Sequence, residues 1–336
     1  MSWWLSNEAE HTTTDVRASE KPLPRRMQEW MESRKNIRPV SSWWPSAIYD
    51  LCPREMAMRI YSPKAEETKA FWTFRWDMGT AVHEWMQERH YGPMRVLLGN
   101  WICTGCGYTV TGKMPGELHS CKARWRAWKY EEPRFVFKRP HWKYPIVGRV
   151  DGELDDEPPP GCSSRRGLLE LKTSNANRFP IDLKTDSLWP KYEFQIQLYL
   201  GLMDREWCKV HFVEPTGLFN PKKHGCSWDI PIQEIIVLRD AEILARALDK
   251  VERAEEFLKT ITVPTTQWPL RICDSPSDYR AKRCLFAKEC FDDVGMEALI
   301  GKIKSGGSVP VEKVHASGRS GFLFRGVNAV DGGVSV

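Results

Sequence analysis

Two short stretches of sequence decide the predicted fold: Gly148-Arg149-Val150-Asp151-Gly152 and Leu168-Leu169-Glu170-Leu171-Lys172-Thr173. Both contain β-strand patterns, and side chains alternate between the two faces of a strand. Glu170 and Lys172 therefore share one face, while the leucines beside Glu170 share the other and can enter a core. Carboxylates from both stretches and a lysine at one sheet edge can hold a divalent cation and a phosphate oxygen together. A nuclease centre is the first hypothesis, and an acidic turn beside a solvated strand face is the alternative.

The composition is that of an ordinary globular protein of 336 residues, long enough for one large domain or two small ones. Its hydrophobic content of 41% and its charged content of 28% fit that class. No apolar run is long enough to cross a bilayer, and no signal-peptide core is found, so we expect a cytoplasmic protein without membrane contact, located in the host cytoplasm if a phage encodes it. The formal net charge of +5 allows a local basic patch for nucleic acid but does not require one.

The ten cysteines gather in groups, and without a secretory signal such groups favour metal ligation over disulfides. Cys103-x2-Cys106 is followed by His119 and Cys121, which are the ligand types of a tetrahedral zinc site. We expect a small loop-rich zinc insertion at residues 97–130. Its second half is irregular, because a single residue separates His119 from Cys121, so another residue can also complete the four ligands. The alternative is a set of free thiols.

Two predicted helices carry polar side chains that can join the strand residues. The helix expected over residues 77–91 carries His83, whose alternative role is a half-buried histidine with one hydrogen bond. The helix expected over residues 192–203 places Gln195 and Tyr199 four residues apart on one face, which is otherwise simply its exposed side. Strand and helix patterns elsewhere predict strands at 135–137, 146–150, 168–172, 207–213 and 227–232 and helices at 41–61 and 239–259.

Four motifs follow one another along the chain: His83, Asp151, Glu170-x-Lys172 and Gln195-x3-Tyr199. In this order the sequence resembles the PD-(D/E)XK nuclease superfamily and, more narrowly, its RecB-like exonuclease branch, which includes phage exonucleases and CRISPR-associated nucleases. The resemblance covers residues 41–290. It implies an α/β fold in which a mixed central sheet is flanked by helices, as in the core of restriction endonucleases.

The resemblance also implies a role for each motif residue. The ligands of Mg²⁺ or Mn²⁺ would be His83, Asp151, Glu170 and the main-chain carbonyl of Leu171. Oxygen ligands with one imidazole suit these cations. Lys172 would lie beside the scissile phosphate and orient or help to deprotonate the attacking water. Gln195 and Tyr199 would position the lysine or contact the DNA backbone.

The same branch often carries an iron–sulfur cluster that joins the two ends of the nuclease domain. The corresponding [4Fe–4S] ligands here would be Cys52, Cys273, Cys284 and Cys290. Cys273 departs from the family pattern, because ten residues separate it from Cys284 where the family usually has two. The alternative is that these cysteines are buried small hydrophobic residues.

The chain divides into six predicted parts. These are a flexible N-terminal arm (1–38), the N-terminal helical region of the nuclease domain (39–96), the zinc-binding insertion (97–130), the nuclease core (131–265), a cysteine-containing C-terminal region (266–300) and a flexible tail (301–336). We expect a metal-dependent exonuclease that acts on DNA ends or single strands in recombination, repair or phage DNA metabolism. The alternatives are a nucleic-acid-binding or structural metalloprotein with an idle nuclease fold, and a structure-specific endonuclease. A homo-oligomer and partners from recombination or replication are both compatible with the sequence.

Overall fold

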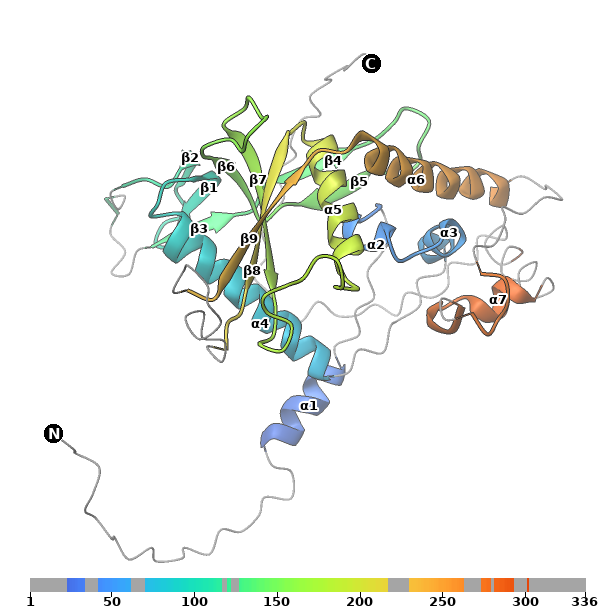
Figure 1. Cartoon of the computed structure of the whole chain (residues 1–336). Helices are drawn as coiled ribbons and strands as arrows, with labels where there is room; N and C mark the ends of the chain where they lie inside the picture. Colours follow the sequence, from blue (N-terminus) through green and yellow to red (C-terminus); the bar gives the residue numbers. More distant parts are fainter. Residues whose placement is uncertain are drawn as a thin grey trace, which may run out of the picture.

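The computed structural model describes residues 23–33, 42–61, 70–116, 120–121, 127–216, 230–262, 273–278, 281–292 and 301. A mixed β-sheet lies at the centre of this part of the chain, and helices cover its two faces (Figure 1). The predicted α/β architecture with a mixed central sheet is therefore confirmed. Among the described helices, none has the length and apolar character needed to span a membrane.

Seven strands form the central sheet, in the order β2-β1-β6-β7-β8-β9, and β3 also pairs with β1. Their bounds are β1 (Leu97–Cys103), β2 (Thr109–Lys113), β3 (Trp128–Glu131), β6 (Gly152–Asp155), β7 (Arg166–Thr173), β8 (Trp207–Val213) and β9 (Ile232–Leu238). Among the described strands of this sheet, only β7 and β8 pair in parallel, and helix α5 (Trp189–Leu202) provides the crossover that a parallel pair needs. Strands β4 (Arg134–Phe137) and β5 (Ile146–Arg149) form a separate antiparallel pair.

Strand β7 is covered on both faces, and residues 167–171 are all buried. Leu169 and Leu171 join a cluster with Met86 of helix α4 (Ala70–Met86), and Leu168 packs in another cluster with residues of α5. The side chain of Glu170 is 4% exposed and lies on the α5 face. Burial on both faces follows from the central position of β7 in the sheet.

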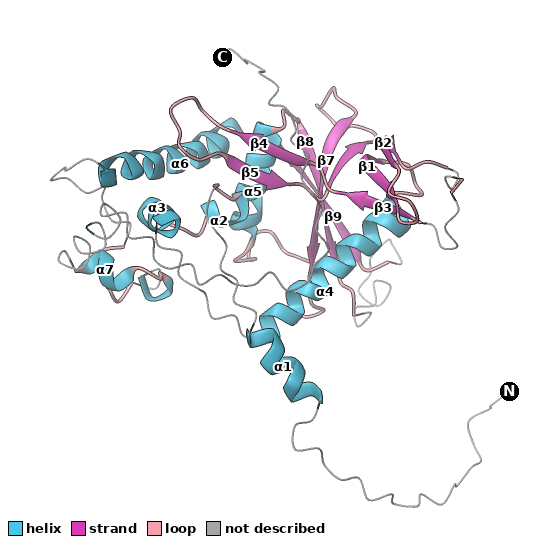
Figure 2. Cartoon of the chain, turned by 180° about the vertical axis from the view of Figure 1, so that it is seen from behind, coloured by secondary structure: helices cyan, strands magenta, loops and turns pink. Residues whose placement is uncertain are grey.

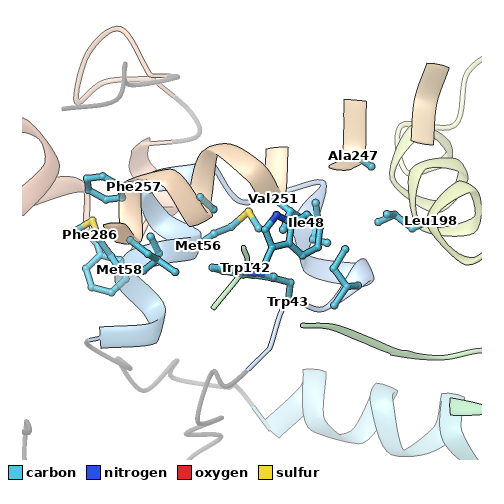
Figure 3. Close-up of a cluster of buried hydrophobic side chains, with 14 residues drawn as sticks. Trp43, Ile48, Met56, Met58, Trp142, Leu198, Ala247, Val251, Phe257 and Phe286 are labelled. Carbon is cyan, nitrogen blue, oxygen red and sulfur yellow. The ribbon is translucent and has the colours of Figure 1, made fainter. Parts of the chain in front are cut away.

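Helix α6 (Ala241–Thr262) lies outside α5 and completes the layer on that face (Figure 2). Its buried side chains recur at helical spacing, at Ala247, Val251, Ala254 and Leu258. They pack with Leu198 of α5 and Met56 of the N-terminal helices in one cluster (Figure 3). Helices α5 and α6 and the N-terminal helices therefore share one apolar cluster, which is separate from the two clusters that flank β7.

Residues 41–61, where the sequence predicts a capped helix followed by further helix, are not helical throughout. Two short helices occur instead, α2 (Pro45–Ile48) and α3 (Pro53–Tyr61), after a helix α1 (Leu23–Ser33) within the predicted N-terminal arm. The break is explained by Pro53, because a proline suits the first turn of a helix and disfavours helical geometry in the residue before it.

Other boundaries also differ from the predicted ones. The helix expected from residue 77 begins at Ala70 and ends in a single π-helical turn, η1 (Gln87–Tyr91). The strand expected at 227–232 is β9, which begins only at Ile232, and residues 227–229 lie outside the described part. Strands β1–β3 of the predicted insertion extend the central sheet, since β1 pairs with β6. The C-terminal region contains a 3₁₀ turn, η3 (Ala281–Arg283), and a short helix, α7 (Ala287–Phe291). Apart from residue 301, the predicted tail lies outside the described residues.

Candidate active site

The candidate site begins where strands β6 and β7 stop pairing with each other. Pairing between these strands ends with Gly152 opposite Leu169, so the Leu171 N–H is released from the ladder. It donates a hydrogen bond to Asp151 Oδ2 at 2.6 Å. Asp151 follows β5 and begins the turn into β6, so its carboxylate lies directly beside the middle of β7. The two stretches that decide the fold thus meet at this carboxylate.

His83 and Glu132 complete a cluster around Asp151. His83 Nδ1, from α4, hydrogen-bonds to Asp151 Oδ1 at 3.2 Å. One ligand atom from each of His83, Glu132 and Asp151 lies within 4.8 Å of the others. Two carboxylates and an imidazole are a donor set that suits Mg²⁺ or Mn²⁺. We call these three residues the carboxylate–imidazole cup.

Glu132 is the member of the cup that sequence reasoning missed. It lies in the connection between β3 and β4, and the register of the β4–β5 ladder places it opposite Asp151. Arg134 pairs with Arg149, and Val150 N donates to Pro133 O at 3.1 Å, so the next facing pair is Glu132 and Asp151. The signal was the pairing of two strands, which a motif search along one strand does not detect.

Gln87 forms hydrogen bonds to two residues of the cup. Its Nε2 donates to Glu132 Oε1 at 3.2 Å and to the Asp151 main-chain oxygen at 2.7 Å. The side chain is 2% exposed and belongs to the π-helical turn η1, which directly follows α4. Such turns shift the direction of the side chains that follow them. Gln87 therefore positions two acidic groups from one helix end.

Glu170 joins a second polar group on the α5 side. Lys172 Nζ donates to Glu170 Oε1 at 2.5 Å, and Gln195 Nε2 donates to the same oxygen at 3.2 Å. Gln195 Nε2 also lies 2.7 Å from the Tyr199 hydroxyl. The Lys172 ammonium lies 4.9 Å from the ring centre of Tyr192. The structure thus brings four predicted side chains together on this side, those of Glu170, Lys172, Gln195 and Tyr199. Glu170 is not one of the three residues of the cup.

The charged groups of the site shift one another's pKa values. Burial opposes ionisation of Asp151, but the charge and hydrogen bond of His83, the charge of Lys172 and the Leu171 N–H lower its pKa below the ordinary value. Burial raises the pKa of Glu170 to about 7, and the negative charge of Asp151 adds to this effect against the opposing charge of Lys172. Burial, followed by the charge of Asp151, also raises the pKa of Glu132. Glu132 and Asp151, both partly buried, lie close enough together to favour a cation between them.

The basic groups respond in the opposite direction. Burial alone would lower the pKa of Lys172, but Glu170 and Asp151 raise it, so the side chain is an ammonium ion at neutral pH. Burial likewise opposes the charging of His83, yet Asp151 raises its pKa. Lys172 is therefore a positive point charge next to the cup, and its ammonium group can donate hydrogen bonds to a phosphate oxygen.

Three of the predicted zinc ligands converge. One sulfur from each of Cys103, Cys106 and Cys121 lies within 4.8 Å of the others, and Cys103 Sγ is 3.9 Å from Cys121 Sγ. Gly107 adopts a φ of 76°, which glycine tolerates and which closes the turn after Cys106. Three thiols at this separation fit a tetrahedral zinc site. The fourth predicted ligand, His119, lies outside the described residues.

The predicted iron–sulfur ligands also come from distant parts of the chain to one place. Cys52 interacts electrostatically with Cys273 and Cys290, and Cys284 with Cys52. Arg54 Nη1 donates to Cys290 Sγ at 3.5 Å. Burial raises the pKa of the Cys284 thiol to about 12, and Glu55 adds to this. The ligand atoms of these four cysteines are not among the described groups that lie within 4.8 Å of one another.

The known proteins that resemble this chain are solved structures, and exonucleases are among them. No family model and no curated protein matches the sequence. Solved structures with a similar fold include an alkaline exonuclease from Laribacter hongkongensis, also solved in complex with dAMP, and a phage-related exonuclease from Haemophilus somnus.

The similarity to these structures lies at the level of the fold. The dAMP complex shares 16% identity, with a TM-score of 0.39, over 69% of this chain and 92% of that chain. The phage-related exonuclease shares 14% identity, with a TM-score of 0.36, over 66% of this chain and 94% of that chain. An activity for this chain therefore has to be argued from its own site.

Proposed function

We propose that this chain is a metal-dependent nuclease that hydrolyses phosphodiester bonds in DNA, and that it acts as an exonuclease on ends or single strands. The observation that carries the proposal is the position of Asp151. Its carboxylate receives the imidazole of His83 and the N–H of Leu171, has Glu132 opposite it, and lies beside the Lys172–Glu170 pair. Acid groups for a divalent cation and a lysine for a phosphate oxygen thus occur together.

The cup residues His83, Glu132 and Asp151 would hold Mg²⁺ or Mn²⁺, with Glu170 and the Leu171 carbonyl as further predicted ligands. When bound, the cation supplies neutralisation of phosphate charge and a lower pKa for a coordinated water. Lys172 contributes a positive charge for a phosphate oxygen and orients the attacking water. To do so it shares its ammonium hydrogens between Glu170 and the substrate.

Gln195 and Tyr199 act in this proposal as positioning residues. Gln195 donates to Glu170 and contacts the Tyr199 hydroxyl, and both side chains are buried. Burial raises the pKa of Tyr199 well above its ordinary value, so it stays protonated and available as a hydrogen-bond donor. Together they fix the carboxylate that in turn fixes Lys172.

Two further metal sites accompany the nuclease proposal. Cys103, Cys106 and Cys121, with His119 as the fourth ligand, would bind a structural Zn²⁺. The second site, a [4Fe–4S] cluster on Cys52, Cys273, Cys284 and Cys290, would join α3 to the C-terminal region. Anaerobic purification with metal analysis and an absorption spectrum tests both, because a brown protein with iron supports the cluster and a colourless protein with zinc alone removes it.

The decisive test of the nuclease compares Asp151→Asn with Asp156→Asn. Asp156 is a control because it is the same residue type in the nearby β6–β7 connection, paired with Lys209 and outside the cup. Loss of a metal ligand removes several kcal/mol of transition-state stabilisation, so we expect Asp151→Asn to cleave labelled DNA about 1,000-fold more slowly. Asp156→Asn should cleave at the rate of the original protein.

The assay uses linear and circular DNA, single- and double-stranded, with Mg²⁺, Mn²⁺ or a chelator. Cleavage of linear substrates alone supports an exonuclease, whereas cleavage of circles indicates an endonuclease. Equal activity of Asp151→Asn and the original protein, with both folded by circular dichroism, contradicts the assignment. DNA binding without cleavage under every metal condition indicates an idle nuclease fold.

A further inference from the structure

The β4–β5 hairpin presents two arginines directly opposite one another. Arg134 pairs with Arg149 in the antiparallel ladder, and both are exposed. The neighbouring pair, Pro133 and Val150, is joined by a main-chain hydrogen bond of 3.1 Å. Hydrogen-bonded and non-hydrogen-bonded pairs alternate along such a ladder, so the arginines form a non-hydrogen-bonded pair, in which Cα atoms are about 4.5 Å apart and side chains come closest.

Two like charges in this position are unfavourable unless something with the opposite charge lies between them. Other arginines of this region have acidic partners: Arg165 pairs with Asp155, and Arg205 with Glu153. In the part of the chain that the structure describes, neither Arg134 nor Arg149 has a carboxylate within 4.0 Å of its guanidinium nitrogens. The pair is therefore arranged to receive an anion from outside the chain.

The same ladder fixes where this anion lies relative to the cup. Residues two apart on a strand share a face, so Arg134 follows Glu132 and Arg149 precedes Asp151 on one side of the hairpin. The step between the arginine pair and the acidic pair is about 6.6–6.8 Å along the strands. The charge of Arg149 reaches Glu132, which agrees with this placement. A positive pair thus adjoins the acidic pair within one rigid element.

Farther along the same face of β4, apolar and charged residues follow one another. Val136 is 62% exposed, and Lys138 beyond it is also exposed. The opposite face is occupied by Phe135, which packs edge-on against Tyr199. The hairpin is therefore anchored by its inner face, while Arg134, Val136 and Arg149 on its outer face are exposed and can contact a ligand with phosphate groups and flat apolar surfaces.

We propose that Arg134 and Arg149 together bind one backbone phosphate of the nucleic acid, next to the phosphate that is cleaved. Arginine suits this role because its planar group forms paired hydrogen bonds to phosphate oxygens. The pair fixes the register of the strand in the cup and so decides which bond is hydrolysed. This inference rests on the proposed nuclease function, because it places a substrate contact beside that site.

The test measures binding of a fluorescein-labelled single-stranded oligonucleotide by anisotropy over a series of salt concentrations, with Ca²⁺ in place of Mg²⁺. The full chain is compared with Arg134→Gln, Arg149→Gln and the double variant. Loss of one phosphate contact should reduce the slope of log K against log salt by about 0.7. Since both arginines share one phosphate, the two single changes should not be additive.

The matched control is Arg165→Gln combined with Arg253→Gln, which removes the same net charge from two other exposed arginines. This control should keep the original slope. An equal loss of slope in the control and the hairpin double variant overturns the inference, because the removal of any two positive charges would then explain the weaker salt dependence. In a second experiment, a methylphosphonate replaces single phosphates of the oligonucleotide. One position next to the cleaved bond should weaken binding to the original protein and leave the double variant unaffected.

The outcomes separate this inference from the proposed function. If the original protein cleaves DNA and the hairpin double variant keeps the full salt slope, the inference is wrong and the nuclease stands. If the double variant loses the slope and no metal supports cleavage, the phosphate site is supported and the nuclease fails. If the original protein does not bind the oligonucleotide, both are wrong.

Discussion

Replacing Gln87 by leucine tests whether the cup is held by its surroundings or only by its own ligands. Gln87 is buried and donates through one nitrogen to Glu132 and to the main-chain oxygen of Asp151. Leucine has a similar size but no donor. Both acceptors therefore lose a partner, while the packing around the π-helical turn is largely kept.

The expected cost follows from these two contacts. Each buried acceptor left without a donor costs about 1–3 kcal/mol, and the greater apolar character of leucine offsets part of the total. We expect Gln87→Leu to lower the free energy of unfolding by about 2–4 kcal/mol in a chelator. Because Glu132 is no longer held in place, affinity for Mn²⁺ should also fall, by about 10- to 100-fold, as is usual for residues behind metal ligands.

The assay is urea denaturation in a chelator, followed by calorimetric titration with Mn²⁺. Gln197→Leu is the matched control, because Gln197 is also 2% exposed and also makes two hydrogen bonds. It donates to the Leu238 main-chain oxygen at 2.8 Å and accepts from the Asp240 N–H at 2.7 Å, and neither partner belongs to the cup. It should lose similar stability while binding Mn²⁺ normally. Equal Mn²⁺ affinity in the two variants would refute the positioning role of Gln87.

Two further predictions concern the helical layer. Burial opposes ionisation of Glu252, but hydrogen bonds from Trp142 and His141 and the charge of His141 hold its pKa below the ordinary 4.5. The stability that this carboxylate adds is present above pH 4.5 and disappears as the pH falls through the lowered pKa. The difference in unfolding free energy between the original protein and Glu252→Gln should therefore shrink as the pH is lowered from 5. A difference that stays constant with pH contradicts this prediction. A methyl group on Gly201 would clash with the Leu244 side chain, so Gly201→Ala should lower the free energy of unfolding, measured by urea denaturation, by about 1–3 kcal/mol. In a protein that already carries Leu244→Ala, the same change should cost distinctly less. Additive effects of the two changes would contradict the clash.

Several parts of the site could be predicted from sequence because the information was local. Alternation on β7 placed Glu170 and Lys172 on one face, and they form a hydrogen bond. The four-residue spacing on α5 placed Gln195 beside Tyr199, and they are in contact. His83 and Asp151 are 68 residues apart, and their contact was expected only through the resemblance to nucleases.

The remaining features depend on pairing between distant segments. Glu132 faces Asp151 only because β4 pairs with β5 in one register, and a shift of one residue would turn both carboxylates to the other face. The burial of Glu170 depends on where α5 crosses the sheet, which no local pattern of β7 contains. The break before α3 has a local origin, because Pro53 disfavours helical geometry in the residue before it.

The contact between α6 and Trp43, which lies just before α2, affects how the chain folds while it is being synthesised. Trp43 Nε1 donates to Glu255 at 2.8 Å, across 212 residues, and Glu255 also accepts from the main-chain N–H groups of Lys143 and Tyr144. At typical ribosome speeds of about 5–20 residues per second, Glu255 is synthesised roughly 10–40 s after Trp43. During that interval α2 and α3 have apolar surface without its final cover, so the nascent chain should depend on chaperones until α6 has left the ribosome.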